Sequence, residues 1–203
     1  MDKNADLRFS ERVILLDVSF LSHTVGMVRE VMSARLGRPL PKLDLAAWLD
    51  CLLLDAGIRD FSSTEVQVLL AHGAADDALE ACTPSLLSDL DGKACRTALA
   101  EYVFSVVPTE NMATAETLFQ DLSALVLNNA SVRQLLLVPA ASDEEKLGGM
   151  LAEILRERKE KAGGGDVQVV WFRLEAPALP SVCHWCPLVP SLAHVLGIRS
   201  EEL

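Results

Sequence analysis

The stretch Arg133-Gln134-Leu135-Leu136-Leu137-Val138 is a short apolar run of the kind that forms a strand buried on both faces of a sheet. Leu147, Leu151 and Leu155 follow it at helical spacing, which predicts an amphipathic helix. Val167-Gln168-Val169-Val170-Trp171-Phe172 is a second run of strand type. A strand, a helix and a strand in this order predict a right-handed crossover between parallel neighbours.

The rest of the chain extends this pattern toward the N-terminus. Further strands are predicted at residues 13–19, 66–72 and 102–107, and helical periodicity follows at 25–36, 45–53 and 112–126. We therefore expect one three-layer, Rossmann-like α/β domain over residues 1–203, with a mostly parallel sheet of about five strands and helices on both faces. Its core spans residues 12–175, and the proline-rich tail, residues 176–203, packs on that core. Residues 75–101 are left without an assignment.

Composition limits where in the cell this domain is expected and what it is expected to bind. Half of the 203 residues are hydrophobic, but no run approaches the ~18 consecutive apolar residues of a membrane span. The polar N-terminus lacks the apolar centre of a signal peptide, and five scattered cysteines are typical of reduced thiols rather than a disulfide framework. We expect a cytoplasmic protein. Its net charge of −11 disfavours broad binding to nucleic-acid backbones.

Acidic residues stand where ligands bind in such folds, beyond the carboxyl ends of the strands. Asp17 ends the first predicted strand, and Asp143 follows the strand at 133–138. If these two strands are neighbours, both carboxylates face one pocket, where Mg²⁺ or Mn²⁺ would relieve their repulsion and activate water for phosphodiester hydrolysis. Each residue also has a plain structural interpretation: Asp17 accepts hydrogen bonds from a loop, and Asp143 belongs to a helix N-terminus.

The chain resembles the PIN-like superfamily of nuclease domains, especially its NYN branch, over residues 12–172. The resemblance rests on the strand and helix that open at Val13–Ser19, on Phe119-Gln120-Asp121-Leu122, and on Pro139-Ala140-Ala141-Ser142-Asp143. It implies a divalent-metal-dependent ribonuclease or phosphoesterase that acts on RNA. The implied metal ligands are Asp17, Asp121 and Asp143, with Asp17 and Asp143 as the catalytic pair.

Two positions depart from the family pattern and keep an alternative open. Phe20 stands where the family often has an asparagine, and Ala141 occupies the first of two aspartate positions in the late loop. With this incomplete acidic set, the alternative is a non-catalytic α/β scaffold that acts through protein contacts. A homodimer is one form of such contact, with Trp185, Leu188 and Val189 of the tail as its apolar candidates.

Overall fold

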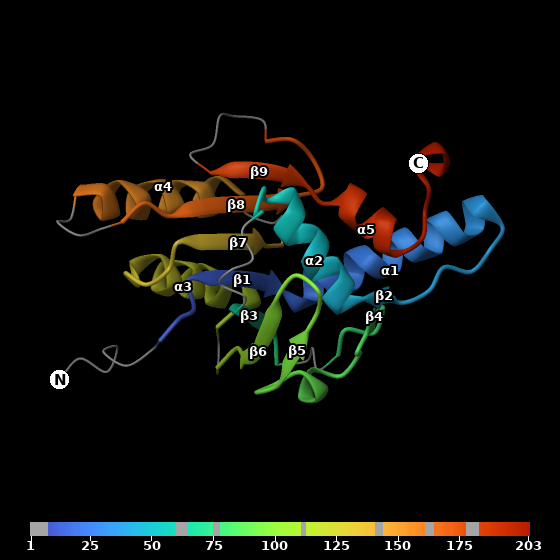
Figure 1. Cartoon of the computed structure of the whole chain (residues 1–203), viewed down its shortest axis with the longest axis horizontal. Helices are drawn as coiled ribbons and strands as arrows, with labels where there is room; N and C mark the ends of the chain where they lie inside the picture. The colour runs from blue at the N-terminus through green and yellow to red at the C-terminus, as the bar shows by residue number, and fades with distance from the viewer. Residues whose placement is uncertain are drawn as a thin grey trace.

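A computed structural model describes residues 8–59, 65–74, 78–110, 113–140, 144–160, 165–177 and 183–203. Within these residues, one sheet has seven strands in the order β5-β6-β3-β1-β7-β8-β9 (Figure 1). The strands are β1 (Arg12–Asp17), β3 (Glu65–His72), β5 (Ala94–Arg96), β6 (Glu101–Pro108), β7 (Gln134–Val138), β8 (Gln168–Arg173) and β9 (His184–Pro187). The helices are α1 (Val18–Leu36), α2 (Leu45–Asp55), α3 (Ala115–Asn128), α4 (Glu144–Glu160) and α5 (Val189–Val195). Two short strands, β2 (Leu43–Asp44) and β4 (Cys82–Thr83), pair separately.

The sheet is parallel except at one edge, where the short β5 runs antiparallel to β6. Numbered by their place in the chain, the six parallel strands of this sheet in the described residues lie in the order three, two, one, four, five, six. This is the order of the doubly wound dinucleotide-binding folds, which change winding direction between the first and fourth strands. Here that switch point lies between β1 and β7, which are parallel neighbours.

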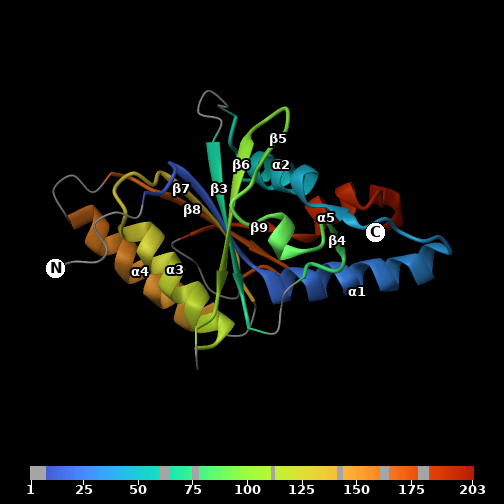
Figure 2. The same cartoon turned by 90° about the horizontal axis from the view of Figure 1, so that it is seen from below.

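Alternate residues of the strands support two separate cores on the two faces of the sheet. Ile14 and Leu16 pack in one core with residues of α1, α2 and α5. Val13 and Leu15 pack in the other with residues of α3 and α4. Figure 2 shows these two groups of helices on opposite sides of the sheet, so the molecule has three layers. All four side chains are fully buried, and each such burial stabilises the fold by about 1.5–3 kcal/mol.

Local signals begin and end the helices that frame the sheet. Asp17, Asp44 and Thr114 cap the N-termini of α1, α2 and α3 with side-chain oxygens that accept backbone N–H groups, as such residues do. The helix α1 ends at Gly37, whose φ of 64° is strained for residues with a Cβ. None of the helices in the described part of the chain combines the length and apolar composition needed to cross a bilayer.

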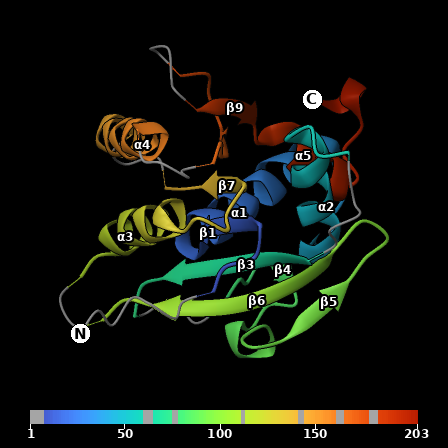
Figure 3. The same cartoon turned by 60° about the vertical axis from the view of Figure 1, so that its left-hand side comes forward.

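The predicted α/β class and the predicted crossover at 133–172 are confirmed, but the sheet is larger than expected. The tail does not only pack on the core: β9 joins the sheet beside β8, with Trp185 opposite Trp171. The unassigned region contributes β4 and the antiparallel edge strand β5. Figure 3 shows β5 and β9 at opposite edges. Edge strands need only one paired side and little burial, so their sequences lack the apolar run that marks a central strand.

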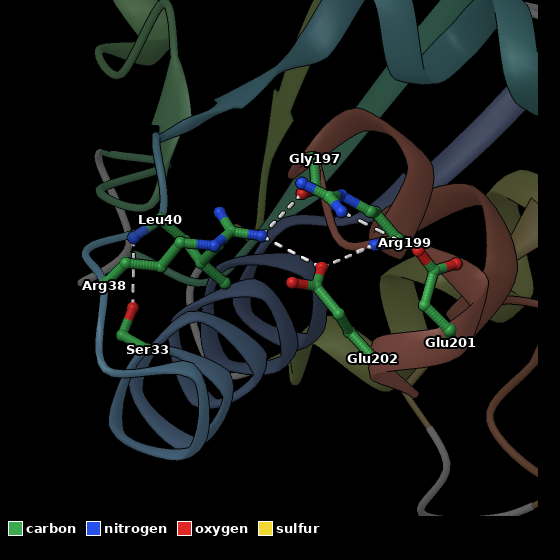
Figure 4. A network of polar contacts seen from close by, with 7 residues as sticks. All are labelled: Ser33, Arg38, Leu40, Gly197, Arg199, Glu201 and Glu202. Carbon is green, nitrogen blue, oxygen red and sulfur yellow. Dashed lines mark hydrogen bonds and ion pairs between the residues drawn. The ribbon is translucent and has the colours of Figure 1, made fainter.

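The last residues of the chain are held against the C-terminal end of α1 by arginines (Figure 4). The Arg38 guanidinium donates to the Gly197 carbonyl at 2.9 Å and to the Glu202 carboxylate at 3.0 Å. The same carboxylate accepts the backbone N–H of Arg199 at 2.8 Å. The backbone hydrogen bond, together with the charge of Arg38, lowers the pKa of Glu202. These contacts position the segment after α5 on the face of the sheet that α1 covers.

Candidate functional site

The switch point places Asp17 beside the end of β7. Leu16 is the register partner of Val138. Asp17, the last residue of β1, and Pro139, the first residue after β7, therefore follow this pair on two adjacent parallel strands. The arrowheads of β1 and β7 point to the same end of the molecule (Figure 1). The condition that the sequence analysis set for a shared pocket, that these two strands are neighbours, is therefore met.

A small pocket lies at this junction and is defined here as the switch-point pocket. Its volume is about 10 Å³, which is about the space of one water molecule. It combines the end of β1, the end of β7, the first turns of α3 and the beginning of α4. Its lining residues are Asp17, Glu116, Phe119, Gln120, Pro139, Ala140 and Leu147.

Asp17 is almost completely buried, with 2% of its surface exposed. Its Oδ1 atom accepts the backbone N–H of Phe20 at 2.8 Å, which begins α1. A buried carboxylate is costly unless it is hydrogen-bonded, and the positive end of the helix dipole also favours its charge. Asp17 is thus a hydrogen-bond acceptor, as its structural interpretation expected, but the donor shown here is the first turn of α1 and not a loop. The same side chain also lines the pocket.

The second carboxylate of the switch-point pocket comes from Glu116, which sequence reasoning missed. Thr114 caps α3 by accepting the N–H of Thr117 at 3.1 Å, and this places Glu116 in the first turn of the helix. Gln120 lies one turn later and donates from Nε2 to Glu116 Oε1 at 3.2 Å. The spacing of Glu116, Phe119 and Gln120 puts them on one stripe of a helix, so a helical-face argument would have found this carboxylate.

The two other predicted metal ligands, Asp121 and Asp143, differ in whether the structure describes them. Asp121 is exposed on α3 and is not among the residues that line the switch-point pocket. Asp143 lies outside the described residues, so its distance from Asp17 stays a prediction. In the sequence it follows the pocket-lining Ala140 by three residues and precedes the pocket-lining Leu147 by four.

The ligand chemistry of the pocket is restricted to oxygen donors. Asp17 and Glu116 supply carboxylates, and Gln120 supplies an amide oxygen. Within the described ranges, no three His, Cys, Asp or Glu side chains gather closely enough to hold a metal ion by themselves. Mg²⁺, however, commonly binds through one or two carboxylates and completes its shell with water and substrate phosphate. The donor set suits a hard cation of that kind and does not suit zinc, which prefers nitrogen and sulfur.

Comparison with known proteins assigns the chain to a family. The sequence profile of one family, described as a family of unknown function, matches residues 6–203. The chain belongs to the DUF6621 family. No match was found among curated proteins or among solved structures. All the residues of the switch-point pocket lie within the region that matches DUF6621.

Proposed function

We propose that this DUF6621 protein is a divalent-metal-dependent phosphoesterase, similar in type to PIN-like ribonucleases, with its cation in the switch-point pocket. One observation carries the proposal: Asp17 from β1, Glu116 from α3 and the end of β7 line the same small pocket. Acidic side chains from separate elements that converge beyond the carboxyl ends of parallel strands are typical of a ligand site in this class of fold. Asp143 is the third carboxylate in this proposal.

The proposed roles follow from the contacts of each residue. Asp17 and Glu116 would hold Mg²⁺ or Mn²⁺, and Gln120 would keep Glu116 oriented through its 3.2 Å hydrogen bond. Because one oxygen of Asp17 accepts the Phe20 N–H, the carboxylate is fixed before any cation arrives. A bound cation would supply charge for a phosphate oxygen and would lower the pKa of a bound water.

The charge of the chain limits the substrates that fit this proposal. A net charge of −11 opposes long contacts with a polyphosphate backbone. The substrate is therefore a single accessible phosphodiester, in a short RNA strand or a small phosphoester, that is recognised mainly at the cation. All five cysteines are free, which is usual in a reducing compartment and supports the expected cytoplasmic location.

A second candidate function is a non-catalytic scaffold, and one specific observation favours it. The pocket has about the volume of one water molecule and one of its carboxylates already caps a helix, so every contact described there is also explained by structure alone. In this case the protein acts through its surface. Of the three tail residues expected at a dimer contact, Leu188 is fully buried, Val189 is half-buried and Trp185 is 36% exposed.

Thermal melting with and without Mn²⁺ distinguishes the two candidates. A native-state site stabilises the protein by about 2.7 kcal/mol at one hundred times its Kd, which raises the Tm by roughly 5–10 °C in a chain of this size. We expect this rise in the wild type, its loss in Asp17→Asn and a smaller rise in Glu116→Gln. Asp121→Asn is the matched control, because it removes an exposed carboxylate from the same helix as Glu116.

Activity provides the second measurement. Cleavage of a short fluorogenic single-stranded RNA and of bis(p-nitrophenyl) phosphate is followed with Mn²⁺ and with EDTA. Metal-dependent cleavage that Asp17→Asn abolishes and Asp121→Asn retains supports the phosphoesterase. No Mn²⁺ response of the wild type in melting, together with no cleavage, contradicts it and leaves the scaffold.

A further inference from the structure

A groove of about 520 Å³ lies at the end of the sheet opposite the switch-point pocket, where β1, β7 and β8 begin. We define it as the amino-end groove. Its volume falls in the range of small-molecule binding sites, roughly 300–1,000 Å³. Its lining residues are mostly polar: Glu11, Arg12, Arg133, Gln134, Asp166, Val167 and Gln168. The groove therefore offers space and hydrogen-bonding groups at a place that the phosphoesterase proposal does not use.

A ladder of side chains fixes one wall of the amino-end groove. Arg12, Gln134 and Gln168 are register partners across β1, β7 and β8. The Arg12 Nε–H donates to Gln134 Oε1 at 2.8 Å, and the Gln134 amide donates to Gln168 Oε1 at 3.0 Å. The ladder continues to the C-cap of α2, because the Gln168 amide donates to the Ala56 carbonyl at 3.3 Å. These polar groups are ordered before any ligand binds, which lowers the entropic cost of binding.

Arg133 is the groove residue with unused binding capacity. Its side chain is exposed, and its guanidinium makes no hydrogen bond or ion pair with any described residue. It lies against the backbone of Gly165, where a Cβ would collide with its Nη1 atom. The absence of a side chain at Gly165 thus leaves room for the guanidinium. A guanidinium with free donors is well suited to phosphate or carboxylate groups.

The charges around the groove favour an anion despite the acidic chain. Arg12 and Arg133 are balanced by Glu11 and Asp166, but Arg158 adds a third cation next to Gly165, to whose carbonyl it donates at 3.0 Å. Arg158 is only 7% exposed, and its hydrogen bonds to described residues all go to carbonyls. Burial and the nearby charge of Arg133 lower the pKa of Arg158, which nonetheless stays charged, as arginine does in proteins.

We propose that the amino-end groove binds a small organic oxyanion, with Arg133 as the main contact and Arg12 as the second. The shared chemistry is a phosphate or carboxylate group that accepts the guanidinium donors. The glutamine ladder supplies further hydrogen bonds to the body of the ligand. This site is independent of the cation pocket at the other end of the strands.

Isothermal titration calorimetry of the full chain, with pyrophosphate in one series and citrate in another, tests the proposal. The protein is stripped of metal ions on a chelating resin beforehand and the buffer is chelator-free and low in salt, so that no cation at Asp17 contributes, no added carboxylate competes, and guanidinium contacts are not screened. We expect saturable binding of at least one probe at a single site, and the tighter probe identifies the phosphate or the carboxylate class. Arg133→Gln should weaken binding at least tenfold, in line with loss of a charged hydrogen bond.

Three further variants make the result specific. Gly165→Ala should weaken binding because its methyl group displaces the Arg133 guanidinium, and Asp17→Asn should leave binding unchanged. Arg199→Gln removes an exposed arginine elsewhere and should also have no effect. The proposal is overturned if neither probe binds saturably, if Arg133→Gln binds as the wild type does, or if Arg199→Gln weakens binding as much as Arg133→Gln.

Discussion

The carboxylate of Asp17 accepts a hydrogen bond of 2.8 Å from the backbone N–H of Phe20. Phe20 also stands at the position where the PIN-like pattern often has an asparagine. In this protein the backbone of Phe20, and not its side chain, forms the hydrogen bond to Asp17. One side chain therefore begins α1 and lines the switch-point pocket. Substitutions that retain or remove its hydrogen-bonding capacity separate these two roles.

Asp17→Ala should destabilise the protein by about 1 kcal/mol, because it removes the N-cap of α1. Asp17→Asn should be close to the wild type in stability, since asparagine caps helices as well as aspartate does. Urea unfolding followed by circular dichroism measures both values. Asp44→Ala is the matched control: Asp44 caps α2 by accepting the Ala47 N–H at 3.1 Å, so its loss should weaken the fold similarly without changing the Mn²⁺ response.

Tyr102 should keep its proton far into the alkaline range. It is the only tyrosine in the sequence, so absorbance at 295 nm reports its ionisation alone. Burial of the ring, followed by its hydrogen bond to Asp50 at 2.6 Å, raises the pKa of Tyr102. The native protein should show no absorbance change near pH 10, where the urea-unfolded chain titrates. A native transition near pH 10 would contradict the buried hydrogen bond.

The raised pKa of Tyr102 makes the free energy of unfolding depend on pH above about 10. The folded protein retains a proton that the unfolded chain releases, so the stability present below pH 10 should fall as the pH rises further. Tyr102→Phe should remove this contribution and lose about 1 kcal/mol at neutral pH. Asp50 then retains the Thr97 hydroxyl, which donates to it at 2.8 Å. Urea unfolding at several pH values measures both effects.

Arg158→Met should destabilise the fold by roughly 3 kcal/mol, because several backbone carbonyls lose the charged group that donates hydrogen bonds to them. The guanidinium donates to the carbonyls of Leu127, Asn129, Val132 and Gly165. It joins the end of α3 to the beginning of β7 and to the segment before β8. Arg156→Met is the control, since Arg156 is exposed on the same helix. Equal unfolding midpoints for the two variants would show that the carbonyls are satisfied without Arg158.

Hydrophobic spacing was enough to predict the strands at the centre of the sheet, but not their order. The apolar runs at residues 13–19 and 133–138 imply buried parallel strands, whereas their adjacency was only a condition of the predicted pocket and is supplied by the observed strand order. The adjacency of Asp17 and the end of β7 follows from that. The edge strands were not predictable in the same way. His184-Trp185-Cys186-Pro187 alternates only weakly and ends in proline, and its strand conformation comes from pairing with β8.

The predicted ligand on α3, Asp121, does not line the switch-point pocket, and the physical reason is the geometry of the helix. Asp121 was selected by resemblance to a family motif, whereas the helix itself decides which side chains face the sheet. Successive residues of an α-helix turn by about 100°, so Asp121 points away from the stripe that Glu116 and Gln120 share. A prediction made from the buried stripe around Phe119 would have chosen Glu116.

The central position of β1 has a consequence for how the chain folds during synthesis. This strand precedes both of its neighbours in the chain, β3 and β7, which pair with it at residues 67–71 and 134–138. Until both have emerged from the ribosome, one of the most apolar strands of the protein has an open edge, which is an aggregation risk for a nascent chain. The halves on either side of β1 therefore join late, and a chain interrupted before residue 138 lacks the strand that closes the middle of the sheet.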